Sequence, residues 1–498
     1  MEEASSFLHV TSPLVLSVTT LIIAVLCNLI RHLKNASKWP VIVNKESVLR
    51  LLGIRLGDIP TTVIMDSAVA VDALVRRADA FSDRPAGGGA TTIISNGRLQ
   101  IITTVPYGPH WVALRRNLSS EAFHPVRGLA RAAPHRARAL AALVADIAAR
   151  SASTSAGGGG GAVPVRECLY AALFALNAAT CFSDGVVDGE RVEAMRAAQQ
   201  EFLRILPSFR VFATFQKVAK LLYRDRWNQL VHCRRRQEEL YLPLIRERQE
   251  RRGNTKTTAS YVDTLLDLEV PDKGDPPHGR RKLNDGEMVG LVSEYLGAAT
   301  GTVLAVLEWT LANLVLRPDV QSRLRREVEA AAAGAGGEAS CAYLRAVVME
   351  SLRRHPPVPS VQRHMSRDVV VGSTPVARGT LVNFSLEEVG RDGKIWTFPE
   401  EFIPERFMPG GEGEGVRLTI GTKEATKVMM MPFGAGRRIC PGMGYTILHI
   451  EYFLANLITA FEWHPLEAEE VNLKADHGFF TTMFHPLQAR VVPRVRQS

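Results

Sequence analysis

The chain has 498 residues, of which 46% are hydrophobic and 22% are charged. This composition excludes an intrinsically disordered protein and is sufficient for one large core or two domains. The formal net charge of +9 predicts a basic face toward an acidic protein or an anionic lipid, and no nucleic-acid motif accompanies it. The six cysteines form no CxxC pair, so the sequence predicts neither a zinc site nor a disulfide framework.

An apolar run lies near the N-terminus. Residues 13–30 are nearly uncharged, and a run of ~18 residues is at the short end of the length that spans a bilayer. Basic residues beginning at Arg31 follow it, so the positive-inside rule places the rest of the chain on the cytoplasmic side. We expect a membrane anchor over residues 1–33, a short linker over 34–60 and the main domain over 61–498. A cleaved signal peptide is the alternative, which the acidic residues before the run disfavour.

Helices dominate the main domain, with a few short strands. Thr61–Met65 predicts a strand that leads into a helix ending at about Arg77. Pro109 marks the start of another helix, and alanine-rich helices follow to about Arg150. The Ser- and Gly-rich residues 151–161 predict a surface linker.

A long buried helix is predicted over Leu283–Leu316, because this segment has few helix breakers and carries apolar residues nearly all round. Beyond it, short strands are predicted at Val369–Val371 and Thr380–Phe384. The fold class that follows is mainly α with a small β-sheet subdomain.

An acid and a base lie three residues apart on a later helix. Glu350 and Arg353 share one side of a helix that ends before His355, since prolines follow that residue. Such pairs are usually solvated and contribute about 0.2–1 kcal/mol. Arg406, within the Pro-Glu-Arg-Phe segment downstream, is a further guanidinium that could join the pair.

The strongest signal is a decapeptide near the C-terminus. Phe433, Gly436, Arg438, Cys440 and Gly442 follow the spacing F-x-x-G-x-R-x-C-x-G. Backbone N–H groups freed by glycine can point at the sulfur while arginine supplies positive charge, and both stabilise a thiolate. The motif therefore predicts that the cysteine ligates haem iron. For an isolated cysteine, a buried and inert thiol would be the alternative.

In this decapeptide the sequence resembles the cytochrome P450 superfamily of haem-thiolate monooxygenases, and its Gly-Arg-Arg-Ile-Cys-Pro-Gly wording is similar to that of plant microsomal members. The resemblance implies the cytochrome P450 fold, with the long central helix crossing the distal face of haem b. It also implies that Cys440 is the axial ligand, whose electron donation favours O–O cleavage. The main domain is then the catalytic domain.

The resemblance assigns roles to further residues. Thr302 is the expected catalytic residue, because its hydroxyl can relay a proton from water, although an ordinary helix threonine bonded to a carbonyl is an equal alternative. Trp111, Arg115, Arg438 and His364 are expected to bind the haem propionates, which need cationic or N–H partners when buried.

Two structural sets complete the expected site. Glu350, Arg353 and Arg406 are implied to form a buried charge triad that locks the haem-binding loop. Phe433, Gly436 and Gly442 are implied to shape that loop. The apolar stretch 202–215 is expected to roof the substrate channel, with helix core as the alternative.

One position of the central helix departs from the family pattern. The residue before the threonine is usually Asp or Glu, and here it is Gly301. Its loss removes a proton-relay group, and we expect glycine to open the helix to water. The proline-rich hinge that usually follows the anchor is also reduced, to Pro40.

The sequence thus predicts a monooxygenase that hydroxylates a lipophilic small molecule with O2 and electrons from an NADPH-cytochrome reductase. The resemblance implies a single-pass protein of the endoplasmic reticulum membrane with a cytosolic catalytic domain. Lys423, Lys427 and Arg437 could form a docking surface for the reductase, or a solvated loop. Two alternatives stay open because of Gly301: a haem-thiolate isomerase or dehydratase that does not use O2, or a catalytically impaired haem-binding protein.

Overall fold

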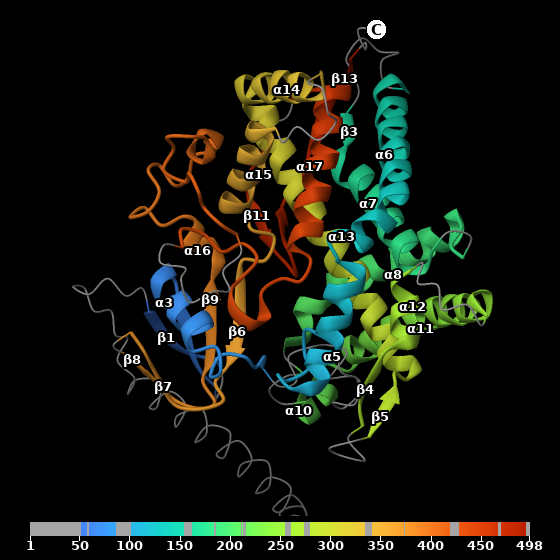
Figure 1. The fold of residues 1–498 in the computed structure, drawn as a ribbon, viewed down its shortest axis with the longest axis vertical. Coiled ribbons are helices and arrows are strands. Elements are labelled where there is room, and N and C mark those ends of the chain that lie inside the picture. The colour runs from blue at the N-terminus through green and yellow to red at the C-terminus, as the bar shows by residue number, and fades with distance from the viewer. Residues whose placement is uncertain are drawn as a thin grey trace, which may run out of the picture.

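The described part of the chain begins at Leu51. The computed structural model describes residues 51–56, 59–85, 101–153, 162–183, 186–210, 212, 216–253, 260–272, 279–333, 341–372, 374–418, 428–466 and 470–494. The predicted anchor over 1–33 lies outside these residues. Figure 1 shows a helical body joined to a smaller part in which β1, β6 and β9 lie beside α3.

Helices make up most of the body. They are α3 (Ser67–Val71), α5 (Pro109–Asn117), α6 (Arg127–Ser153), α7 (Val165–Phe182), α8 (Gly189–Ile205), α10 (Gln216–Leu222), α11 (Arg224–Arg252), α12 (Tyr261–Asp267), α13 (Asp285–Leu316), α14 (Pro318–Ala333), α15 (Ala342–Arg354), α16 (Leu386–Gly390) and α17 (Met443–Ala460). Short π-helical turns are η1 (Asp72–Arg76) and η2 (Leu118–Ala122), and 3₁₀ turns are η4 (Leu206–Arg210), η5 (Pro404–Phe407) and η6 (Gly436–Arg438). The predicted long helix is α13, displaced by two residues at its start.

The strands form one larger sheet and several small ones. The four-stranded sheet has the order β1 (Leu51–Leu56), β2 (Ile59–Ile64), β9 (Leu381–Ser385), β6 (Ser360–His364). A three-stranded sheet joins β10 (Phe461–His464), β13 (Gln488–Pro493) and β3 (Ala162–Pro164). The two-stranded sheets are β4 (Glu269–Pro271) with β5 (Arg280–Lys282), β7 (Val369–Val371) with β8 (Thr374–Val376), and β11 (Ala475–His477) with β12 (Thr481–Met483).

The start of the larger sheet corrects one predicted boundary. Leu51 pairs with Ile64, and the whole of β1 runs antiparallel to β2. The expectation of a linker over 34–60 is therefore wrong at its C-terminal end, because the sheet already includes Leu51–Leu56. The strand β2 also pairs in parallel with β9, which comes far later in the chain. The sheet thus ties the beginning of the domain to the segment after α15.

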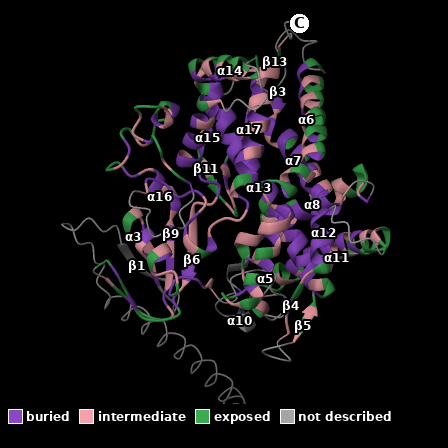
Figure 2. Cartoon of the chain, in the orientation of Figure 1, coloured by how far each residue is buried: buried purple, intermediate pink, exposed green. Residues whose placement is uncertain are grey.

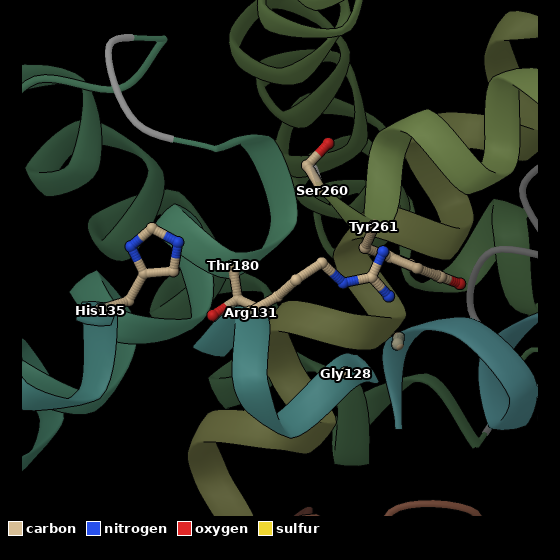
Figure 3. A pocket seen from close by; sticks show the side chains of 7 residues that line it. Gly128, Arg131, His135, Thr180, Ser260 and Tyr261 are labelled. Atoms are coloured by element: carbon tan, nitrogen blue, oxygen red, sulfur yellow. The ribbon is translucent and has the colours of Figure 1, made fainter. Parts of the chain in front are cut away.

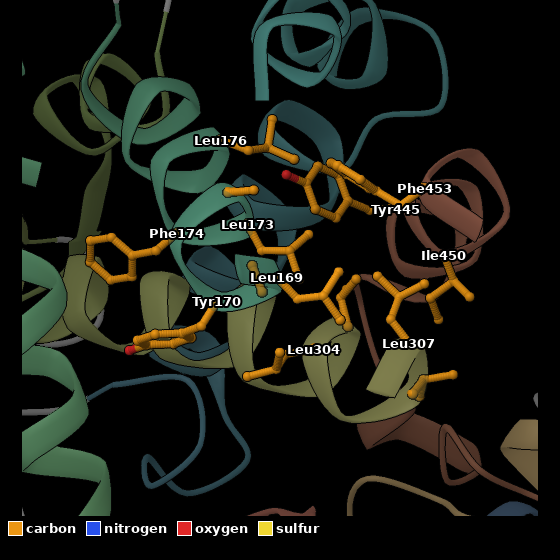
Figure 4. Packing of buried hydrophobic residues seen from close by; sticks show 14 of the residues in the cluster. Leu169, Tyr170, Leu173, Phe174, Leu176, Leu304, Leu307, Tyr445, Ile450 and Phe453 are labelled. Atoms are coloured by element: carbon orange, nitrogen blue, oxygen red, sulfur yellow. The ribbon is translucent and has the colours of Figure 1, made fainter. Parts of the chain in front are cut away.

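Helix α13 is the centre of the core. It begins with a capping box, in which Asn284 and Glu287 exchange side-chain to backbone hydrogen bonds of 2.9 and 3.0 Å. Figure 2 shows that buried residues concentrate around this helix and α17, and Figure 4 shows Leu173 of α7, Leu304 of α13 and Ile450 of α17 meeting in one cluster. Such packing makes α13 a rigid support for the residues on its flank.

Two helices of the described residues are long and apolar enough to cross a membrane. They are α7 and α13, and both are mostly buried inside the protein. Their apolar composition is therefore accounted for by the core. The stretch 202–215 contributes to a separate small core, in which Phe202, Ile205 and Phe212 pack with residues of α11.

A buried ion pair links α7, α13 and the C-terminal strands. Glu308 of α13 is 0% exposed and accepts two hydrogen bonds of 2.9 Å from Arg166, and it also accepts one of 3.1 Å from the backbone of Leu487. Arg166 in turn donates to the Met483 carbonyl at 2.6 Å. Burial raises the pKa of Glu308, while Arg166 and the Leu487 N–H lower it.

Replacing Arg166 with methionine should leave Glu308 charged and unpaired in the core, which costs about 3–5 kcal/mol of unfolding free energy. Without Arg166 the pKa of Glu308 rises further. A carboxyl whose pKa is higher in the folded than in the unfolded protein favours folding at low pH and loses that contribution as the pH rises through the folded pKa. Denaturant unfolding should therefore show a loss that is largest at neutral pH and shrinks in acid.

The matched control is Arg325→Met, since Arg325 pairs with Glu329 on the surface of α14 at 2.7 Å. That change should cost less than about 1 kcal/mol. Equal losses in the two variants, or a loss at Arg166 that does not depend on pH, would contradict the role given to the buried carboxylate.

Candidate functional site

The loop before α17 holds Cys440 between packed segments. The Cys440 N–H donates to the Phe433 carbonyl at 3.0 Å, which closes the loop. Gly436 has a φ of 70°, and a Cβ there would collide with the carbonyl oxygen of Leu74 in η1. Both the backbone conformation and the close approach therefore require glycine at position 436. This contact explains why the motif has glycine at position 436.

The pKa of the Cys440 thiol lies above its ordinary value, because burial outweighs the groups around it that favour the thiolate. Burial raises the pKa of Cys440, whereas a backbone hydrogen bond from Gly442 and the charge of Arg115 lower it. Arg115 is held in place by a 2.5 Å hydrogen bond from its Nη2 to the Ile439 carbonyl. In the described part of the chain, no group of three His, Cys, Asp or Glu side chains is placed to hold a metal ion by itself. A single thiolate suits a metal whose other ligands come with a cofactor.

Arg438 lies buried beside the cysteine loop. It donates to the carbonyls of Ser82, Ile102 and Val105 at 2.5, 3.2 and 2.7 Å, and its guanidinium lies 4.9 Å from the ring centroid of Trp111. Burial, followed by the charge of a neighbouring arginine, lowers the pKa of Arg438 to about 10. These acceptors are neutral carbonyls, and the charges of Asp83 and Glu294 raise the pKa of Arg438 by less than burial and Arg84 lower it.

Two further arginines face the same region. Arg363 of β6 is 1% exposed, and burial together with the charges of Arg84 and Arg438 lowers its pKa well below the usual value. The Nε atoms of Arg84 and Arg363 and the Nε1 of Trp111 are buried and have no hydrogen-bond acceptor among the described residues. Buried cations and unpaired donors are costly, so the cluster fits an anion that arrives from outside the chain. The two carboxylates of haem have this chemistry.

His364 follows Arg363 on the same strand, and strand alternation indicates that its side chain points away from this cluster. Successive side chains of a strand point to opposite faces, and the neighbouring Arg363 faces the interior. The backbone N–H of His364 donates to the Asp83 carbonyl at 2.9 Å, and its side chain is half-buried. Arg363 and Arg84 were not among the residues predicted from the sequence. The motif Gln-Arg-His left the strand register open by one residue, and the segment around Arg84 carried no signal of its own.

The predicted charge triad is in contact. Arg353 forms a bidentate pair with Glu350, with distances of 2.7 and 2.8 Å, and both side chains are 0% exposed. Arg406 has its Nε 3.4 Å from a carboxylate oxygen of Glu350 and also pairs with Glu412, which the sequence analysis did not select. The Glu350 carboxylate accepts a further 2.8 Å hydrogen bond from the Ile403 backbone. Helix α15 is thereby joined to η5 and the segment before it.

Thr302 lies one helical turn after Ala298 on α13. Ala298 is exposed and Thr302 is half-buried. Its hydroxyl donates to the Ala298 carbonyl at 2.8 Å, which is the ordinary bond of a helix threonine. Gly301 is buried, and a Cβ there would collide with the ring of Phe480. The expectation that glycine opens this helix to water is therefore wrong, because an aromatic ring covers the position.

A small polar pocket lies elsewhere in the body (Figure 3). It is lined by residues of α6, α7 and α12, including His135, Thr180 and Tyr261, and its volume is about 10 Å³. This is room for about one water molecule. None of the predicted site residues lines it. Of the predicted docking residues, Arg437 packs over Tyr107 at 4.8 Å, and the two lysines lie outside the described residues.

Comparison with known proteins identifies the family and the fold. The family model "Cytochrome P450" matches residues 29–491. Cytochrome P450 89A9 of Arabidopsis thaliana is 36% identical over 455 residues, covering 89% of this chain and 86% of its own length. Cytochrome P450 78A11 of Oryza sativa subsp. japonica is 32% identical over 475 residues, covering 90% and 80%. A zebra fish cytochrome P450 solved with progesterone has the same fold, with a TM-score of 0.71 at 20% identity over 93% of this chain and 98% of that one. The chain belongs to the cytochrome P450 family of haem-containing monooxygenases.

Proposed function

We propose that this protein is a membrane-anchored monooxygenase that hydroxylates a lipophilic small molecule, using O2 and electrons from an NADPH-cytochrome reductase. The observation that carries the proposal is the Cys440 loop beside a cluster of arginines, in which the Nε atoms of Arg84 and Arg363 and the Nε1 of Trp111 are buried without a hydrogen-bond acceptor among the described residues. One similar protein, of Crocosmia x crocosmiiflora, is named a flavonoid 3'-monooxygenase and is 27% identical over 455 residues. An aromatic, largely apolar substrate is consistent with that name.

The proposed cofactor is haem b. Cys440 would ligate the iron, and the propionates would be bound by Arg84, Arg363, Arg438 and Trp111, with Arg115 held against the loop. Arg363 replaces His364 in this set, because it is the member of the pair that faces the cluster. Haem bound to a thiolate supplies the iron chemistry that activates O2 for insertion into a C–H bond.

Thr302 is proposed to deliver protons to the reacting oxygen. Its hydroxyl lies on the exposed flank of α13, and in this structure it is bonded to the Ala298 carbonyl. Rotation about its χ1 would release this bond, after which the hydroxyl can accept a proton from water and donate its own. Phe433, Gly436 and Gly442 would shape the Cys440 loop, on the side of the haem that faces away from Thr302.

The membrane proposal concerns residues outside the described part and one surface within it. Residues 13–30 are the proposed single anchor in the endoplasmic reticulum, with the catalytic domain in the cytosol. Leu221 and Leu222 at the end of α10 are 79% and 69% exposed, and Tyr223, which precedes α11, is 40% exposed. This apolar surface supports contact with lipid and entry of a lipophilic substrate.

Neither of the alternatives is favoured. Membership of a monooxygenase family and the retained Thr302 support O2 chemistry over an isomerase or dehydratase. The measurement that separates them is consumption of O2 and NADPH in proportion to product, in membranes that contain a reductase. Product formed without O2 would favour the isomerase, and no turnover would favour the impaired protein.

The cysteine assignment predicts the spectrum of the reduced protein with carbon monoxide. The parent should show the absorbance of thiolate-ligated haem iron, and Cys440→Ser should lose it. Cys341→Ser is the matched control, since Cys341 only caps α15 and serine is a good cap. Retention of the parent spectrum by Cys440→Ser would overturn the proposed function.

The charge triad predicts a loss of haem-loaded protein in Glu350→Ala. Removing the carboxylate leaves Arg353 and Arg406 without their shared partner in the interior, at a cost of about 3–5 kcal/mol. The ratio of haem absorbance to protein in purified samples measures the effect. Glu400→Ala is the control, because Glu400 pairs with Arg354 at 2.6 Å but is 66% exposed. A normal haem content in Glu350→Ala would contradict the triad.

The cation cluster predicts different results for two adjacent residues. Arg363→Ala should lower haem affinity, measured as the rate of haem transfer to apomyoglobin, by at least about tenfold, since a buried charged contact contributes more than 1.4 kcal/mol. His364→Ala should change that rate less than about threefold. The reverse order would show that the histidine is the propionate ligand.

A further inference from the structure

The ring of Phe480 occupies the space that a side chain at position 301 would need. Phe480 lies in the turn between β11 and β12, and its ring rests against the backbone of α13. A Cβ on Gly301 would lie 2.6 Å from Cδ2 of that ring and closer still to Cε2, whereas ordinary contacts are 3.4–4 Å. No side chain longer than that of glycine therefore fits at position 301 while the ring stays in place.

The turn is held against α13 from two sides. The N–H of Thr481, the next residue, donates to the Pro357 carbonyl at 2.9 Å. The Thr481 carbonyl accepts a hydrogen bond of 3.3 Å from Nε1 of Trp309, which lies about two turns after Gly301 on the same helix. Both Thr481 and Trp309 are buried. The backbone next to Phe480 is thus anchored to the core, and the Phe480 side chain itself is half-buried.

No described carboxylate on α13 takes the place of the lost acid. Glu294 lies on the same helix face as Thr302, two turns earlier, but its oxygens accept hydrogen bonds from the backbone of Ile102 and Thr103 at 3.0 and 2.7 Å. Glu308 is committed to its arginine partner on α7. Within the described residues of the helix, the threonine is therefore flanked by an aromatic ring where the family pattern has an acid.

We propose that Phe480 and Gly301 are a matched pair that sets the width of the site beside Thr302. The ring fills the volume of the missing acid and keeps water from the helix surface at Gly301. Phe480 is therefore a specificity-determining residue, which favours substrates that are narrow at the reacting carbon. This inference rests on the proposed function, because it assumes that haem binds below the flank of α13. It also implies that an acid cannot be restored at position 301 by a single substitution.

Imidazoles of different size that bind the haem iron test how wide the site beside Thr302 is. Phe480→Ala should tighten the binding of 4-phenylimidazole about tenfold relative to unsubstituted imidazole, as the haem absorbance change reports during titration. Phe479→Ala is the matched control, since Phe479 belongs to the same turn, packs edge to face on Phe480 at 4.8 Å and is 49% exposed. Equal selectivity ratios in the two variants would overturn the proposal.

A double-mutant cycle of thermal stability tests the shared space without relying on activity. Gly301→Asp should lower the melting temperature in the parent, because the new side chain must displace the ring. In the Phe480→Ala background the same change should cost clearly less, and additive losses would contradict the pair. Failure of the proposed function would show differently, as absence of the thiolate-type carbon monoxide spectrum in the parent itself, and the stability cycle would still test the pair.

Discussion

The region around the cysteine loop is dominated by buried positive charge that the carboxylates of the chain offset only in part. Arg84 and Arg438 lower the pKa of Arg363, and Arg84 lowers that of Arg438, whereas Glu294 opposes the fall for Arg84 and Arg438. The hydrogen-bond acceptors of Arg438 are backbone carbonyls. An anion brought by a binding partner would lower the cost of such a cluster. Under the proposed function, the carboxylates of haem would relieve repulsion among groups that come from distant parts of the sequence, so haem binding would stabilise the fold.

A second charged group, in contrast, is complete within the chain. Glu350 is satisfied by a bidentate arginine and by a backbone N–H, so its burial needs no outside partner. It connects α15 to the segment that precedes the cysteine loop. The Glu350 cluster supports the segment before the cysteine loop. The arginine cluster keeps unpaired donors at the proposed cofactor site.

The sequence predicted what local pattern determines. Helix α13 and strand β7 were predicted to within two residues, because apolar periodicity and flanking breakers mark them, and the glycines of the cysteine motif followed from the need for close backbone approach. The sequence could not show which of Arg363 and His364 faces the interior, because that depends on the register of β6, which pairs with β9 in the sheet. Arg84 was missed because its importance arises only from charges that the fold brings near it.

The glycine before Thr302 shows why a departure from a family pattern should be interpreted together with its spatial neighbours. From the sequence alone, loss of the acid indicates a leaky site, since nothing suggests what fills the space. Phe480 is 179 positions away in the chain, yet its ring closes the gap that the glycine leaves. A large apolar ring then stands at position 301 in place of a hydrated carboxylate. If Thr302 relays protons as proposed, water would approach it from the Ala298 side, where the helix is exposed.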